Sequence, residues 1–297
     1  MTTSSQSSAQ LHRGASAAPR RLFLRLERLA IAAQRTPART GRDRWPARDR
    51  RVSCPAPGGP LVPASEPAFN SRLADLKLKL VEQGRAVQAL IERAVESVFE
   101  KSREKAARTV EGDRAIDRMD IEIEREAVQL LIDAMAQGVR MNEHAVRTVL
   151  TIVKVNNEFE RIADCAVNIA ERVGSFLDPA ATLPPKFRVM ANSVAGIMQA
   201  TNTAFASMDL AAAQLVLSTD DATEAFKDAI LKDTEQQLAR GEHGVEYAIA
   251  LRTVAVNLGR MSDHCTNVAE QVIYVESGKI VRHQDDRWTK PARVEEL

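Results

Sequence analysis

The chain has 297 residues, which is enough for one large domain or two ordinary ones. Aromatic residues make up only 4%, and aliphatic and charged residues dominate, as is typical of helical bundles. The net charge of +1 hides an asymmetry, because residues 1–52 hold twelve Arg against three acids while the remaining 245 residues carry a net −8. Nucleic-acid phosphates are bound by clustered Lys and Arg, so the acidic body excludes nucleic acid as the main partner. It suits cations or basic protein surfaces.

The cysteines and the hydropathy pattern indicate a reduced, cytoplasmic protein. Cys54, Cys165 and Cys265 form no Cys-x-x-Cys pair, and we expect the last two to pack as small apolar residues. No run of about 18 uncharged apolar residues occurs, so the sequence predicts no transmembrane helix.

Residues 1–66 differ from the rest of the chain. They are rich in Arg, Ser, Ala and Pro and contain no Lys, a composition that predicts a disordered extension. Arg20 and Arg21 resemble a twin-arginine export signal, but charged residues at 25, 27 and 28 interrupt the apolar stretch that such a signal needs. We therefore favour a tail, or translated sequence upstream of the true start. Residues 286–297 are expected to form a flexible C-terminal tail.

Apolar residues recur at three- and four-residue steps from about residue 69 onward, which predicts amphipathic helices. The first set is expected at 86–99, 116–132 and 146–173, and the second at 186–208, 210–240 and 245–276. Glu111-Gly112-Asp113 predicts a break and a helix N-cap, and Gln137-Gly138 predicts a helix end. Prolines at 179, 184 and 185 predict a boundary. The fold class is therefore all-α, with a three-helix bundle at 67–178 and a second at 184–285.

An internal repeat supports this division. Residues 160–171 align with 259–270 at a shift of 99, with five identities in twelve. The identical pairs are Arg161/Arg260, Asp164/Asp263, Asn168/Asn267, Ala170/Ala269 and Glu171/Glu270. Asp113 and Asp117 likewise match Asp220 and Glu224 at a shift of 107. Two tandem copies of one three-helix unit follow.

Two acidic stripes are predicted on neighbouring helices of the first repeat. Helical rotation of about 100° per residue aligns Glu160, Asp164, Asn168 and Glu171 on one side of their helix, away from its apolar face. The second stripe comprises Asp113, Asp117, Asp120 and Glu124.

These stripes allow two interpretations. Adjacent carboxylates repel, and a shared hard cation such as Mg²⁺, Mn²⁺, Ca²⁺ or iron would relieve that repulsion. A solvated face paired with nearby Arg is the alternative. His264 could supply one ligand, although we favour a surface position for it. No Ser-hydrolase, Walker, zincin or dinucleotide motif occurs, and Glu-x-x-His, which di-iron bundles need, is absent from the sequence.

The repeated helices resemble the PhoU family of accessory and regulatory proteins of phosphate-specific transport. The resemblance covers about residues 70–285 and rests on four segments: 111–117, 159–171, 260–270 and 274–283. It implies two pseudo-symmetric three-helix bundles, often as a homodimer. It also implies negative regulation of the phosphate-starvation response, between the phosphate ABC transporter's ATPase and a membrane sensor kinase.

The resemblance further implies metal clusters, of iron or another divalent ion, on acidic motifs. The matching residues are Asp113, Asp117, Glu160, Asp164, Asp220, Glu224 and Asp263. Asp120, Glu124, Asn168, Glu171, Asn267 and Glu270 are additional metal or polar-stripe candidates. Gly259 stands where the motif has an acid, so we expect the second site to be weaker or empty. The main hypothesis is a non-enzymatic regulator, and the alternatives are a metal-binding bundle with an enzymatic or other regulatory role and a purely structural adaptor.

Overall fold

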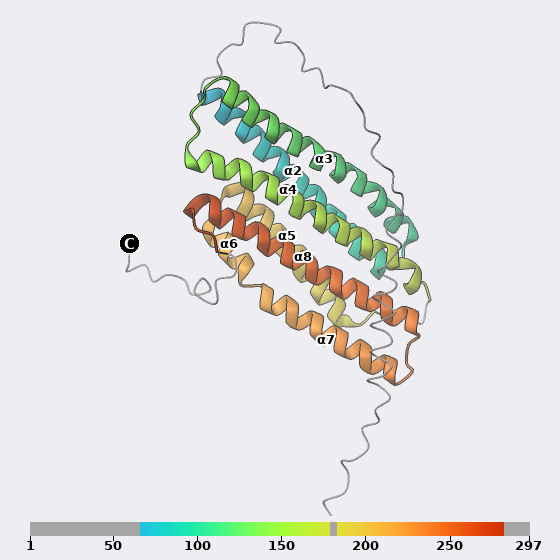
Figure 1. The fold of residues 1–297 in the computed structure, drawn as a ribbon. Helices are drawn as coiled ribbons and strands as arrows, with labels where there is room; N and C mark the ends of the chain where they lie inside the picture. The colour runs from blue at the N-terminus through green and yellow to red at the C-terminus, as the bar shows by residue number, and fades with distance from the viewer. Residues whose placement is uncertain (1–65, 179–182, 282–297) are drawn as a thin grey trace, which may run out of the picture. The chain divides into compact units, whose positions relative to one another are not determined.

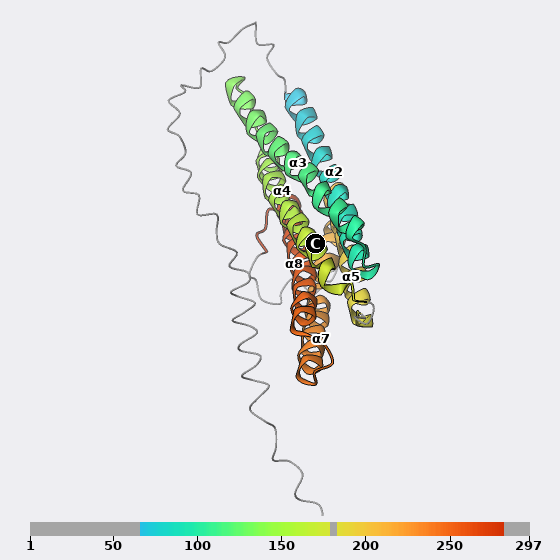
Figure 2. The ribbon, with the colours of Figure 1, turned by 90° about the vertical axis from the view of Figure 1, so that its right-hand side faces the viewer.

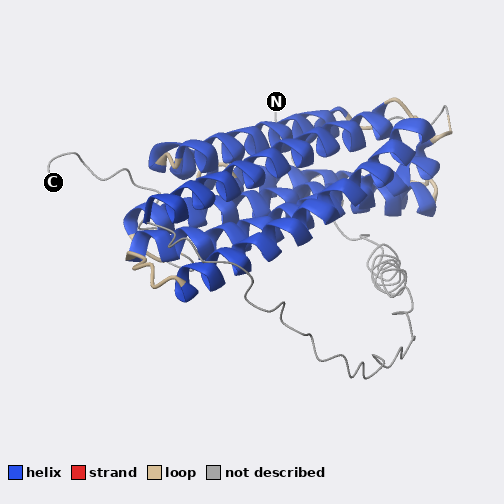
Figure 3. Ribbon diagram, turned by 90° about the horizontal axis from the view of Figure 1, so that it is seen from above, coloured by secondary structure: helices blue, strands red, loops and turns tan. Residues whose placement is uncertain are grey.

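The computed structural model describes residues 66–178 and 183–281, without the side chains of residues 220–222. The predictions for the N-terminal extension, the Arg20-Arg21 pair and the C-terminal tail fall outside these ranges. The described chain contains seven α-helices, one short 3₁₀ helix and no strand (Figure 3). The all-α prediction is confirmed. None of the described helices combines the length and the apolar composition that a membrane span requires.

The first repeat consists of α2 (Glu66–Phe99), α3 (Arg103–Ala136) and α4 (Glu143–Ala170), followed by the 3₁₀ helix η1 (Glu171–Phe176). Each of the three α-helices packs against the other two (Figure 1). The predicted break at Glu111–Asp113 is wrong, because α3 runs through it. Gly112 instead provides a close approach to α2, since an added Cβ would lie 3.0 Å from Leu90 Cδ1.

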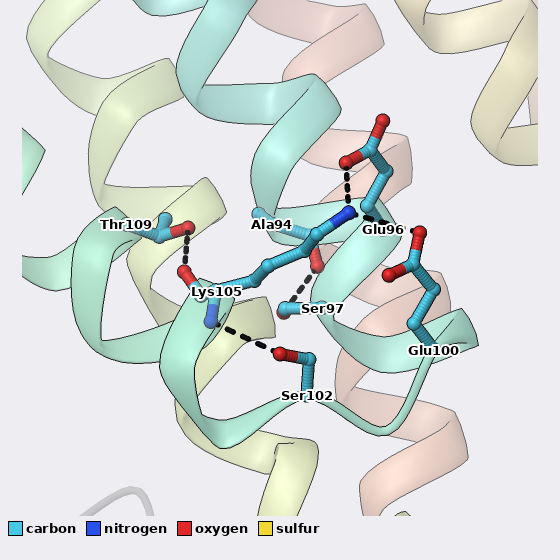
Figure 4. Close-up of polar contacts among 7 residues, drawn as sticks. All are labelled: Ala94, Glu96, Ser97, Glu100, Ser102, Lys105 and Thr109. Carbon is cyan, nitrogen blue, oxygen red and sulfur yellow. Dashed lines mark hydrogen bonds and ion pairs between the residues drawn. The ribbon is translucent and has the colours of Figure 1, made fainter.

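The turn between α2 and α3 explains where α3 begins. Lys101 has a left-handed φ of 54°, and Ser102 then caps α3 by accepting a hydrogen bond from the backbone N–H of Lys105 at 3.2 Å. The Lys105 ammonium reaches back to α2, where it donates to Glu96 at 2.6 Å and Glu100 at 2.9 Å (Figure 4). The Ser102 cap and the ion pairs of Lys105 thus fix the turn between α2 and α3.

The second repeat consists of α5 (Pro185–Ser207), α6 (Leu210–Leu217), α7 (Asp220–Ala239) and α8 (Val245–Ser277). The single helix predicted over 210–240 is therefore two helices. The hydroxyl of Ser218 donates to the carbonyl of Leu215 at 2.7 Å, and that of Thr219 donates to Val216 at 2.6 Å. Such local bonds compete with helix continuation. Together α6 and α7 occupy the place that α3 has in the first repeat.

The two repeats are joined mainly through α4 and α8, whose contact is the most extensive between any two described helices. The two helices lie side by side in both Figure 1 and Figure 2. Phe159 and Ile162 of α4, and Met261 and Cys265 of α8, are all fully buried. The apolar core is consequently one cluster that runs through both repeats.

Candidate functional site

The structure brings the two acidic stripes of the first repeat together. We call the combined surface of α3 and α4 the acidic face. It comprises Asp113, Asp117, Asp120, Glu124, Glu160 and Asp164. Asp117 is exposed on α3, and its charge acts on Asp164 and Glu160 of α4. Asp164 is exposed and Glu160 is partly exposed, so the helical-wheel prediction that the α4 carboxylates point away from the apolar core is confirmed.

Burial and mutual repulsion raise several pKa values on the acidic face. Partial burial, followed by the charges of Asp117 and Asp164, raises the pKa of Asp113 to about 6. Burial and neighbouring carboxylates also raise the pKa of Glu160 and of Asp164, although Arg161 opposes the first rise and Arg260 the second. The acidic face therefore carries negative charge that nearby arginines only partly offset.

Asp120 has a structural role as well. Asn156 of α4 is almost fully buried, and its side-chain amide donates to the backbone carbonyl of Asp120 at 3.0 Å and to its carboxylate at 2.6 Å. Burial, then Glu124 and Asp117, raises the pKa of Asp120. These bonds tie α3 to α4 and fix the spacing of the two stripes.

Two of the additional candidates lie at the far end of the α4 stripe. Asn168 is half-buried in the last turn of α4. Glu171 begins η1, where its carboxylate lies 3.5 Å from the Arg172 guanidinium. Glu171 is therefore paired with arginine.

The donor chemistry of the acidic face suits a hard cation, because it offers only oxygen atoms. Among the described residues, however, no three His, Cys, Asp or Glu side chains converge closely enough to hold a metal ion. The face concentrates carboxylates without arranging them as a complete ligand shell.

The second repeat differs from the first at the equivalent place. Glu224 of α7 and Asp263 of α8 are exposed, and their charges interact. Lys227 donates to Glu224, and its charge also acts on Asp263. Burial raises the pKa of Asp263, and Lys227 opposes this rise. The side chain of Asp220 lies outside the described structure.

The expectation of a surface position for His264 is wrong. His264 is buried between α8 and α4, where its Nδ1 lies 2.7 Å from Glu158 Oε2. Asn267, a candidate for the second stripe, donates to the same carboxylate oxygen at 3.0 Å. Burial would raise the pKa of Glu158, but the bonds from His264 and Asn267 outweigh it and lower that pKa. Asn267 thus contributes a hydrogen bond to the contact between the two repeats.

Sequence reasoning did not identify Glu158. It lies beside the predicted α4 stripe but on the flank facing α8, and its partners are more than 100 residues away. The remaining candidate, Glu270, is half-buried and lines a small pocket with Lys154, Gln271 and Tyr274.

Exposed apolar residues form another feature that was not predicted. On α3, Ile121, Val128, Ile132 and Met135 are exposed, and helical rotation places them within about 60° of one another. Val146 and Leu150 are exposed in the first turns of α4, just beyond the short loop that follows α3. We call these six residues the apolar face. It lies on the same helix pair as the acidic face.

The tandem helical units, with carboxylate stripes on paired helices of the first repeat, define a class of repeat-built, all-helical proteins. The family model described as the PhoU domain matches residues 80–173 and again residues 187–272. The chain therefore belongs to the PhoU domain family. Members of this family are accessory regulatory proteins rather than enzymes, and the same holds for this chain.

Two relatives of known sequence agree with this assignment. The phosphate-specific transport system accessory protein PhoU homolog of Zymomonas mobilis is 28% identical over 215 residues, covering 71% of this chain and 88% of that protein. Homolog 1 of Thermotoga maritima is 28% identical over 216 residues, covering 71% and 90%.

Two crystal structures share the fold. The phosphate transport system regulatory protein PhoU from Streptococcus pneumoniae has a TM-score of 0.66 at 20% identity, covering 72% of this chain and 99% of that one. PhoU from Pseudomonas aeruginosa has a TM-score of 0.65 at 24% identity, covering 71% and 100%.

Proposed function

We propose that this chain is a cytoplasmic accessory protein of phosphate transport that restrains the phosphate-starvation response when phosphate is plentiful. In this proposal it acts as a homodimer between the ATPase of the phosphate ABC transporter and a membrane sensor kinase. The family match and the names of the relatives support the phosphate role. The fold alone would not, because one fold serves many functions.

The observation that carries a regulatory role is the placement of the acidic and apolar faces on α3 and α4. Both present side chains to solvent on the outside of the first repeat. Adjacent exposed apolar and charged patches are typical of protein interaction surfaces. A partner helix with apolar residues at helical spacing and basic residues beyond them would complement both faces.

We further propose that the acidic face binds a divalent cation. Four of its carboxyl groups have pKa values raised by burial and by like charges, so a cation would relieve repulsion that the folded chain otherwise retains. The carboxylates would close around the ion from α3 and α4. The bound ion would alter the charge that this surface presents to a partner.

A phosphate-starvation reporter tests the regulatory proposal. Alkaline phosphatase activity would be measured in a deletion strain grown in ample phosphate and complemented with the full chain or its variants. Asp117→Asn with Asp164→Asn removes two central carboxylates, and Ile132→Asp with Met135→Asp disrupts the apolar face. The matched control, Glu104→Gln with Glu111→Gln, removes two exposed acids of α3 that lie outside both faces.

We expect the full chain and the control to repress the reporter, and both face variants to leave it derepressed while remaining folded. A deletion strain with no derepression would contradict the phosphate role. Repression by both face variants would contradict the assignment of these surfaces. Light scattering of the purified chain would test the homodimer, and a monomer at all concentrations would contradict it.

A further inference from the structure

The internal repeat shows which residues replace the acidic face in the second half of the chain. The shift of 107 that pairs Asp117 with Glu224 also pairs Asp120 with Lys227. The shift of 99 that pairs Asp164 with Asp263 pairs Glu160 with Gly259. One carboxylate has therefore become an ammonium group, and another has lost its side chain altogether.

These two replacements fit together in space. Lys227 lies on α7 and Gly259 on α8, and the two helices pack side by side (Figure 1). A Cβ added to Gly259 would lie 3.0 Å from Cδ of Lys227 and 3.9 Å from its Cγ. The aliphatic stem of the lysine thus covers the position where the first repeat has a glutamate side chain.

The position of the stem places the lysine ammonium group near the two acids that remain in the second repeat, Glu224 and Asp263. The Lys227 ammonium lies 2.5 Å from Glu224 Oε2, and its charge also acts on Asp263. The Lys227 side chain is only 24% exposed, so it is held against α8 rather than extended into solvent. The cation is covalently attached, so holding it costs no translational entropy, unlike capture of a free ion.

We infer that Lys227 is a built-in counter-cation that offsets one of the two negative charges of Glu224 and Asp263 and closes the second repeat to divalent cations. A cation bound by this chain is then confined to the acidic face of the first repeat. That last consequence rests on the metal binding proposed above, whereas the counter-cation role of Lys227 does not.

Manganese binding by the purified full chain tests whether the second repeat is closed to divalent cations. Bound Mn²⁺ per chain would be measured by equilibrium dialysis at pH 7 for the wild type and for Asp117→Asn with Asp164→Asn, which disables the acidic face. In that disabled background, Lys227→Asp with Gly259→Glu transplants the residues of the first repeat into the second. Lys232→Asp is the charge control, because it changes an exposed lysine elsewhere on α7.

We expect the disabled variant to lose its Mn²⁺, the transplant to regain about one ion per chain, and the control to regain none. Retention of Mn²⁺ by the disabled variant, with loss on further Asp263→Asn, would overturn the inference. A folded transplant that gains no Mn²⁺, when the wild type binds it, would also overturn it.

A second measurement separates this inference from the proposed metal binding. If the wild type binds no Mn²⁺, the metal proposal fails, and the role of Lys227 is measured by thermal unfolding without metal. Lys227→Met should lower Tm by roughly 1–3 °C, because an uncompensated acid pair remains. The decrease should shrink by half or more when Glu224→Gln and Asp263→Asn are already present. An undiminished decrease in that background would show that the lysine contributes only packing, and would overturn the counter-cation role.

Discussion

Glu158 of α4 and His264 of α8 lie 2.7 Å apart and join the two repeats through a partly buried polar contact. Asn267 donates to the same glutamate oxygen, so the carboxylate is bonded twice from α8. The next residue along each helix, Phe159 on α4 and Cys265 on α8, is fully buried. Because a partly buried carboxylate without partners is costly, this contact favours the alignment of α4 and α8 that keeps Glu158 bonded.

Replacement of His264 by Ala should destabilise the fold by about 1–3 kcal/mol, because Glu158 would lose a partner while remaining half-buried. Urea unfolding followed by circular dichroism would measure the loss. His144→Ala is the control, since that histidine is exposed and its ion pair with Glu276 is long at 3.7 Å.

A double-mutant cycle separates the polar contact from simple packing. Glu158→Gln combined with His264→Ala should cost clearly less than the sum of the two single losses. Strict additivity would show that the two side chains do not interact energetically.

Replacement of Gly84 by Ala should destabilise the fold by about 1–3 kcal/mol through overpacking. An added Cβ would lie 2.2 Å from Asn202 Oδ1 and 2.9 Å from the Phe159 ring. It would also disturb the bond that Asn202 donates to the Gly84 carbonyl at 2.9 Å. Thermal unfolding would measure the change.

Gly196 in α5 provides the matched control, because nothing lies within 4 Å of a Cβ added there. Gly196→Ala should raise stability by up to about 1 kcal/mol through helix propensity. If Gly84→Ala proved as favourable as Gly196→Ala, the close approach of α2 and α5 would be wrong.

Ionisation of Asp113 should make the protein less stable as pH rises from about 4 to 6. Its folded pKa of about 6 lies above the ordinary value of 3.8, so the folded state binds more protons in that window. Stability then falls with rising pH and levels off above the folded pKa. The loss should be roughly 1–2 kcal/mol after allowance for solvent screening.

Asp113→Asn isolates this effect, because the amide does not titrate. The stability of the variant relative to wild type should increase between pH 4 and 6, as measured by urea unfolding at each pH. Glu158 contributes in the opposite direction, since its lowered pKa gives stability that is lost in acid. A constant difference across the window would refute the raised pKa of Asp113.

The thiols of Cys165 and Cys265 should be unreactive in the folded protein. Both are fully buried, and burial raises the pKa to about 11 for Cys165 and about 12 for Cys265. In a Cys54→Ser background, a thiol-reactive chromophore should label both only as fast as the chain unfolds. Rapid labelling without denaturant would contradict this burial.

The helical class and the acidic stripes were predictable because they depend on local periodicity, although α2 and α3 begin at Glu66 and Arg103 rather than at the predicted residues 86 and 116. The predicted helix end at Gln137-Gly138 is confirmed, since Gln137 is the C-cap of α3 and Gly138 has a left-handed φ of 64°. The helix break predicted at Gly112 was wrong, because this glycine lies within α3 and allows close contact with α2. The break between α6 and α7 was not recognised, since the competing hydroxyl bonds of Ser218 and Thr219 leave the apolar periodicity unchanged.

Sequence alone determined the helical class, the internal repeat, the acidic residues of α3 and α4, and the loss of an acid at Gly259. Each of these follows from spacing along the chain, where a rise and rotation per residue fix which side chains share a face. The tertiary structure decided the contacts between side chains far apart in sequence. It paired Glu158 with His264, and it placed the stem of Lys227 over Gly259, because helix packing sets which faces meet and periodicity within one helix does not.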